Sequence, residues 1–172
     1  PNTFVYSEPR FLQLLAEHLS ARCGWLVASR EKQIIGLLPF LIKDGPLGPV
    51  FNSLAYYGSN GGVIQCEQDI DSKIALIKAF YKMSSDAKAV SATIISNPLE
   101  YDSEIYDKHS MFDFRDERIG LFTDMPKNKD ELLSRFDNPR PRNIRKALKE
   151  GICISKGRSE ALEFLFNTHL EN

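Results

Sequence analysis

The sequence predicts an α+β fold, in which amphipathic helices alternate with short apolar strands. Three observations carry this prediction: 42% of the 172 residues are hydrophobic, two segments place apolar residues at helical spacing, and the runs between them are apolar or β-branched. A chain of this length can bury a real core, as one domain or as two very small ones. Eleven Phe and six Tyr, with ten Gly and nine Pro, do not fit a disordered or low-complexity chain.

The first predicted element is an amphipathic helix over residues 8–22, where four leucines and a phenylalanine recur at helical spacing. Ser7 is placed to cap it, and Pro9 falls in the first turn, where a missing N–H costs nothing. We expect Gly24 to end this helix.

The strands are predicted from short apolar runs bounded by polar or Gly/Pro-rich segments. The second run is apolar on both faces and should be central, and Pro39 within it should cause a bulge or a register break, because proline lacks an N–H donor. Residues 43–49 are rich in Gly and Pro and are expected to be a loop. The expected strands are residues 25–29, 34–42, 50–54, 90–96 and 118–123.

The remaining segments are predicted to be helical or irregular. Residues 99–117 are expected to be a loop with one weak helical turn, whose acidic residues form a solvated face and match no calcium loop. A brief strand is expected over residues 152–154, and the sequence Asn-Pro-Arg-Pro-Arg at 138–142 should interrupt the C-terminal helices. The expected helices are residues 69–87, 130–136, 143–150 and 159–170.

A glycine-rich turn over residues 56–62 is the first candidate binding element. Its glycines would let backbone N–H groups approach an oxyanion or phosphate, while two tyrosines flank the ligand. A tight loop packed by its own tyrosines is the alternative. The turn is neither a P-loop nor a dinucleotide-binding motif. The candidate substrate-binding residues here are Tyr56, Tyr57, Ser59, Asn60, Gly61 and Gly62.

A basic helix near the C-terminus is the second candidate. Arg142, Arg145, Lys146 and Lys149 recur at helical spacing and line one face. Because a guanidinium binds phosphate through two parallel hydrogen bonds, Arg142, Arg145 and Lys149 are candidate ligands of a phosphate-bearing substrate. A solvated face is the alternative. The net charge of −1 favours a local diphosphate over a long polyanion.

Four segments in order resemble the Fem-type peptidyltransferases, the FemAB-like branch of the GNAT acyltransferase superfamily. They are residues 35–40 (IGLLPF), 52–63 (NSLAYYGSNGGV), 97–99 (NPL) and 140–152 (RPRNIRKALKEGI). The last is the most distinctive, although Pro141 separates two arginines that the family places together. The resemblance covers nearly the whole chain.

The resemblance implies a GNAT-like mixed, mostly antiparallel central sheet flanked by helices, as the first of two such domains. Residues 1–127 would form this domain, and residues 128–172 would be a connecting helical segment leading to the second. The implied function is transfer of an acyl or aminoacyl group to an amine of a bacterial cell-envelope (peptidoglycan) precursor. On this expectation the present chain alone is inactive, and no catalytic residue is assigned.

Two alternatives remain from the sequence: an acyl-CoA-dependent N-acyltransferase of polysaccharide or amino-sugar metabolism, and a non-catalytic GNAT-like binding module. The acyl donor would be aminoacyl-tRNA or acyl-CoA, with no covalently bound cofactor. The partners would be a phosphate-bearing small-molecule or cell-wall precursor, aminoacyl-tRNA where it is the donor, and the second domain. Three scattered cysteines and three histidines match no metal-site spacing, and we expect a cytoplasmic protein without a metal or a transmembrane segment.

Overall fold

The computed structural model describes residues 5–53, 61–117, 119–120 and 124–171. The chain divides into two compact units, Pro1–Gly120 and Leu121–Asn172, and each is described by itself. No helix in the described ranges is long and apolar enough to cross a membrane.

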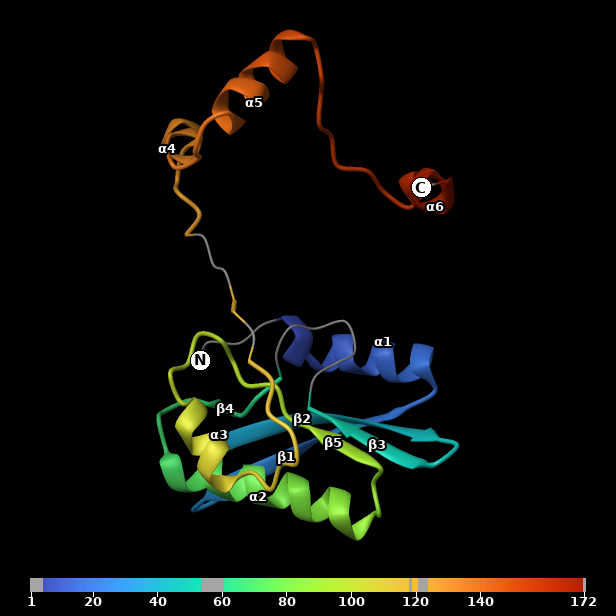
Figure 1. The fold of residues 1–172 in the computed structure, drawn as a ribbon, viewed down its shortest axis with the longest axis vertical. Helices are drawn as coiled ribbons and strands as arrows, with labels where there is room; N and C mark the ends of the chain where they lie inside the picture. The colour runs from blue at the N-terminus through green and yellow to red at the C-terminus, as the bar shows by residue number, and fades with distance from the viewer. Residues whose placement is uncertain (1–4, 54–60, 118, 121–123, 172) are drawn as a thin grey trace. The chain divides into compact units, whose positions relative to one another are not determined.

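The first unit is a mixed sheet with helices on both faces (Figure 1). The sheet order is β1-β2-β3-β5, and β4 pairs with β2 as well; all pairs are antiparallel except β3 with β5, which is parallel. This confirms the predicted fold class. The elements are η1 (Val5–Ser7), α1 (Pro9–Leu19), β1 (Arg22–Arg30), β2 (Gln33–Gly45), β3 (Gly48–Asn52), β4 (Ile64–Gln65), α2 (Ile70–Asp86), β5 (Ser91–Thr93) and α3 (Ser103–His109).

The core has two parts, one on each face of the sheet. Leu41 of β2 packs with Leu12 and Leu15 of α1. Side chains alternate along a strand, so Leu38 and Ile42 point to the opposite face, where they pack with Phe80 and other residues of α2. Figure 1 shows α1 on one side of the sheet and α2 with α3 on the other.

The expected end of the first helix at Gly24 is wrong. The helix α1 ends at Leu19, and Ser20 takes the left-handed conformation with φ of 50°. Gly24 lies inside β1, opposite Phe40, where an added Cβ would stand 2.7 Å from the Phe40 ring. The glycine is therefore required by the close approach of this ring and not by a helix terminus.

The register break expected at Pro39 is also wrong. Pro39 pairs in register with Trp25, and the irregularity lies instead between Ala28 and Ser29. On its other edge, β2 is paired by β4 at 36–37 and by β3 at 41–45, which leaves 38–40 between them without a strand partner in the described ranges. Proline is tolerated there because no ladder bond on that edge needs its missing N–H.

The loop expected over residues 43–49 is instead a tight hairpin. Lys43 pairs with Val50 and Gly45 with Gly48, so that β2 and β3 continue almost to the turn. Gly48 has φ of 133°, which an L side chain rarely adopts and which explains a glycine here. Of the strand expected over 118–123, residues 119 and 120 are irregular, and the rest lie outside the described residues.

The second unit contains three helices: α4 (Lys129–Ser134), α5 (Arg140–Lys149) and α6 (Glu160–Glu171). Asn128 caps α4 by accepting the N–H of Glu131 at 2.8 Å. The helix α5 begins three residues earlier than predicted, because Pro141 falls in its first turn, where a proline needs no N–H partner. The strand expected over 152–154 is wrong: the segment is irregular, and Ile154 is almost fully exposed.

Candidate functional site

The described residues on either side of the glycine-rich turn are anchored to the last residue of β5 and to the segment that follows it. The N–H of Ser53 donates to the Thr93 carbonyl at 2.9 Å, and the Ser53 hydroxyl accepts the N–H of Ile95 at 3.2 Å. At the other end, the N–H of Gly61 donates to the Ile95 carbonyl at 3.0 Å. Because β3 and β5 are parallel, the turn leaves and returns at the carboxyl ends of two parallel strands, where open α/β sheets bind their ligands.

The glycine pair at the end of this turn is buried. An added Cβ at Gly62 would lie 2.7 Å from the Tyr106 hydroxyl and 3.1 Å from the Ser96 Cα, so that no larger residue fits without movement. The structure thus places Gly61 and Gly62 at the anchored root of the turn. Tyr56, Tyr57, Ser59 and Asn60 lie outside the described residues.

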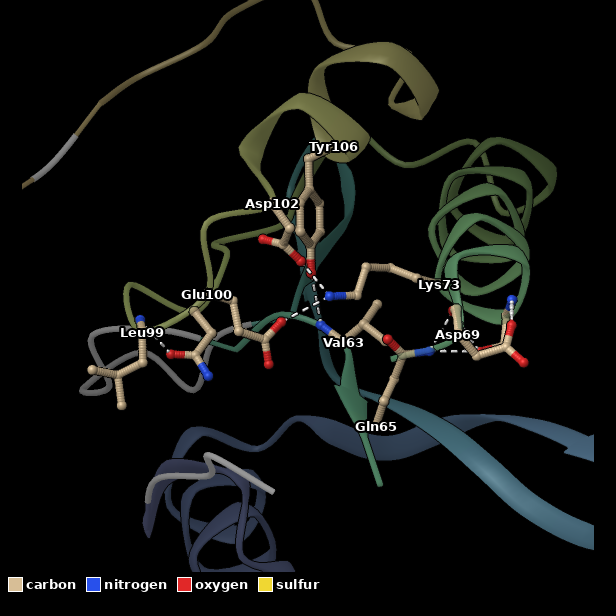
Figure 2. A network of polar contacts seen from close by, with 10 residues as sticks. Val63, Gln65, Asp69, Lys73, Leu99, Glu100, Asp102 and Tyr106 are labelled. Carbon is tan, nitrogen blue, oxygen red and sulfur yellow. Dashed lines mark hydrogen bonds and ion pairs between the residues drawn. The ribbon is translucent and has the colours of Figure 1, made fainter. Parts of the chain in front are cut away.

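A buried ion cluster lies beside this root. Lys73 of α2 is only 8% exposed in its side chain, and its ammonium contacts Glu100 at 2.7 Å and also Asp102 (Figure 2). The second carboxylate oxygen of Asp102, Oδ1, is buried and has no hydrogen-bond partner among the described residues. One ammonium thus faces two carboxylates, which leaves the cluster with an excess of negative charge.

The contacts in the cluster determine the charge state of Lys73. Burial lowers the pKa of the Lys73 ammonium, but hydrogen bonds to Asp102 and Glu100 and the charges of these carboxylates outweigh it, so that the pKa lies above its ordinary value. Lys73 is therefore a permanent cation at neutral pH and is not poised to act as a base.

Tyr106 of α3 connects the cluster with the turn. Its hydroxyl accepts the N–H of Val63 at 2.9 Å, and Figure 2 shows it beside the Asp102 carboxylate and the Lys73 ammonium. Burial raises the pKa of Tyr106, the hydrogen bond from Val63 opposes this, and the charges of Asp102 and Glu100 raise it further. The hydroxyl therefore stays protonated at neutral pH.

The candidate basic residues lie on α5 in the second unit. Arg142, Arg145 and Lys149 are exposed, and none of them forms an ion pair with a carboxylate in the described part of the chain. Lys146, on the same helix, contacts Glu150 at 3.7 Å. The role of Arg142, Arg145 and Lys149 in binding phosphate stays a prediction.

Sequence reasoning missed the ion cluster and Tyr106. The acidic residues from Asp102 to Glu117 are expected to form a solvated face, yet Asp102 turns toward Lys73, as does Glu100 just before it. A signal was present: Lys73 lies three and four residues before Leu76 and Ile77, on the stripe of α2 that the core buries. A lysine on an apolar stripe needs a buried partner. Among the described residues, no group of three or more His, Cys, Asp or Glu side chains could hold a metal ion.

Comparison with known proteins gives one structural likeness. No family model matches the chain, and no curated protein matches it. A crystal structure described as that of a probable acetyltransferase is similar over 70% of this chain and 76% of that chain, with 15% sequence identity and a TM-score of 0.42.

Proposed function

We propose that this chain is the substrate-binding, N-terminal GNAT-like part of a Fem-type acyl- or aminoacyltransferase. The observation that carries the proposal is the anchoring of both ends of the glycine-rich turn, at Ser53 and Gly61, to the end of a parallel strand pair. The order of helix, antiparallel strands, turn, helix and parallel strand agrees with the plan that the resemblance implies.

The proposed reaction is attack of an amine on an acyl carbonyl. The new C–N bond replaces the ester bond of an aminoacyl-tRNA or the thioester bond of an acyl-CoA, and the amine proton is released to solvent or to the leaving group. Rate enhancement would come from positioning the amine and from N–H groups that stabilise the oxyanion. The acceptor would be a phosphate-bearing cell-envelope precursor in the cytoplasm.

The basic face of α5 supports a phosphate-bearing substrate. Arg142, Arg145 and Lys149 are exposed and unpaired within the described residues, and arginine offers phosphate two parallel hydrogen bonds. A uridine-diphosphate-linked precursor needs only such a local patch, whereas a tRNA backbone would add contacts over many phosphates.

Replacing Arg145 tests this assignment. In the complete native protein, Arg145→Ala should remove a charge-assisted contact of about 1.5 to 3 kcal/mol, which corresponds to a ten- to hundredfold loss of affinity. Fold stability should change by at most about 0.5 kcal/mol, because the side chain is exposed. Titration of a uridine-diphosphate-linked precursor and, separately, of an aminoacyl-tRNA at fixed salt measures the loss.

The control is Arg135→Ala, which removes the same charge from the same unit. Arg135 is already held by Glu131 at 2.7 Å and by the Asp124 carbonyl at 2.9 Å, so its loss should leave ligand affinity unchanged. When both titrations are repeated at higher salt, the affinity for aminoacyl-tRNA should fall steeply and the affinity for the diphosphate precursor should fall less. If wild type and Arg145→Ala bind both ligands with equal affinity, Arg142, Arg145 and Lys149 do not belong to the substrate site.

A further inference from the structure

The chain immediately after the glycine-rich turn is held by the side chain of Tyr106. The N–H of Val63 is buried immediately after Gly61 and Gly62, and the Tyr106 hydroxyl accepts it at 2.9 Å. A buried backbone N–H that loses its acceptor is costly, so this hydrogen bond constrains where the chain can pass. One residue later, Ile64 joins the sheet by pairing with Leu37.

Tyr106 is itself fixed from two sides. Tyr106 is 8% exposed and belongs to the core that contains Leu76, Ile77 and Phe80 of α2. Its hydroxyl lies at the cluster of Lys73, Glu100 and Asp102 (Figure 2). Neighbours on both sides leave the hydroxyl little freedom to move.

The Tyr106 hydroxyl makes a hydrogen bond that core packing does not require. A phenylalanine ring would fill the same apolar space, but it could not accept the N–H of Val63. The hydroxyl is also 2.7 Å from the position that a Cβ on Gly62 would take, so Tyr106 limits the path of the glycine pair sterically as well.

We infer that Tyr106 is a positioning residue: through the N–H of Val63 it sets where the glycine pair Gly61–Gly62 rejoins the sheet, and thereby sets the affinity of the neighbouring substrate site. This inference rests on the proposed function, because it assigns the backbone of Gly61 and Gly62 to substrate binding. Tyr106 touches no reacting atom, so it should act on substrate affinity and not on the chemical step.

Tyr106→Phe in the complete native protein tests the inference, with Tyr101→Phe as the matched control, because Tyr101 is fully exposed. In Tyr106→Phe, amide hydrogen exchange of the peptide 61–65 should become about tenfold faster, while exchange of β1 should change less. The thermal midpoint should fall, because the buried N–H of Val63 loses its acceptor. The KM for the acceptor should rise about five- to tenfold with kcat nearly unchanged. Tyr101→Phe should match wild type in every measurement.

Each outcome decides one of the two proposals. Unchanged exchange over 61–65 would overturn the positioning role, whether or not the protein is an acyltransferase. Faster exchange with an unchanged KM, or a fall in kcat in place of the rise in KM, would overturn the link to substrate affinity. If wild type neither binds nor acylates any acceptor, the proposed function fails, and faster exchange in Tyr106→Phe would still support the structural half of the inference.

Discussion

At the scale of single residues, Lys73 is a charged residue at a position of α2 where an apolar side chain is expected. It lies on the buried stripe of α2, and two carboxylates from outside that helix neutralise it. Bringing the side chains of Lys73 and Asp102, which are 8% and 14% exposed, out of water costs several kcal/mol each, and only contacts within the cluster offset that cost. The cluster is therefore sensitive to the loss of one partner.

Lys73→Met keeps the length of the side chain but removes the cation. Glu100 and Asp102 would then face each other without a counter-ion, and we expect the free energy of unfolding to fall by about 3 to 5 kcal/mol. Urea denaturation at pH 7 measures this loss. The folded-state pKa of Lys73 is raised above the unfolded value near 10.5. The stabilisation that the Lys73 cation provides is therefore fully present below the unfolded value, pH 7 included, and is lost only as pH rises through the folded value.

The control for this change is Lys82→Met on the same helix. Lys82 pairs with Asp86 at 2.8 Å, but both side chains are well exposed, so the loss should stay below about 1 kcal/mol. Equal effects of the two substitutions would show that the cluster of Lys73 is no more important than a surface pair.

Residue types alone could suggest the glycine-rich turn and the basic helix, because both are contiguous in the sequence. They could not suggest Tyr106, because its partner Val63 is 43 residues away and a tyrosine in a polar segment has no distinctive pattern. The cluster of Lys73 could be predicted in part, because a lysine on an apolar stripe indicates a buried partner. Which carboxylates supply it depends on tertiary structure.

At the scale of elements, helix termini were predicted well where a side-chain cap exists. Asp69 precedes α2, and its carboxylate accepts the N–H of Ser72 at 2.9 Å. Its other oxygen contacts Arg30 at the end of β1, at 2.8 Å. Asp69 thus stabilises the helix terminus and ties it to the sheet.

Asp69→Asn should weaken this connection in a pH-dependent way. The hydrogen bond from the Ser72 backbone and, after it, the charge of Arg30 outweigh desolvation and lower the pKa of Asp69, so its ionised form stabilises the folded state. That contribution is present above the unfolded value near 3.8 and is lost as pH falls through the lower folded value. Wild type should be more stable than Asp69→Asn at pH 7, and the difference should shrink at pH 2 to 3.

Urea denaturation of both proteins at the two pH values measures this difference. Asp71→Asn, which removes a carboxylate from the first turn of the same helix, controls for the general effect of charge near a helix N-terminus. A difference between wild type and Asp69→Asn that is the same at pH 7 and at pH 2 to 3 would contradict the assignment.

Strand details followed the sequence less closely than helix termini did. Gly24 and Pro39 carry the residue types of a helix end and a strand break, yet both lie inside paired strands. The reasons are tertiary: the Phe40 ring needs the space beside Gly24, and the edge of β2 beside Pro39 has no strand partner in the described ranges. Local signals could not reveal either neighbour. The two-residue β4 is too short for any pattern.

At the scale of the whole molecule, the fold class was predictable because hydrophobic periodicity persists over the long elements α1, β2 and α2. The parallel pairing of β3 with β5 follows from the intervening helix α2, which carries the chain back along the sheet. This crossover places the anchored ends of the glycine-rich turn at the carboxyl ends of the parallel strands, and the proposal of acyl transfer depends on that placement.

An acyl-transfer assay on the complete native protein tests this central claim most directly. The protein is incubated with a uridine-diphosphate-linked cell-envelope precursor that carries a free amine, and with labelled aminoacyl-tRNA or labelled acyl-CoA in parallel reactions. We expect one donor to transfer its label to the precursor amine, detected as the mass of one added acyl group. Binding of the precursor without a mass increase from either donor would contradict acyl transfer and favour a non-catalytic binding module.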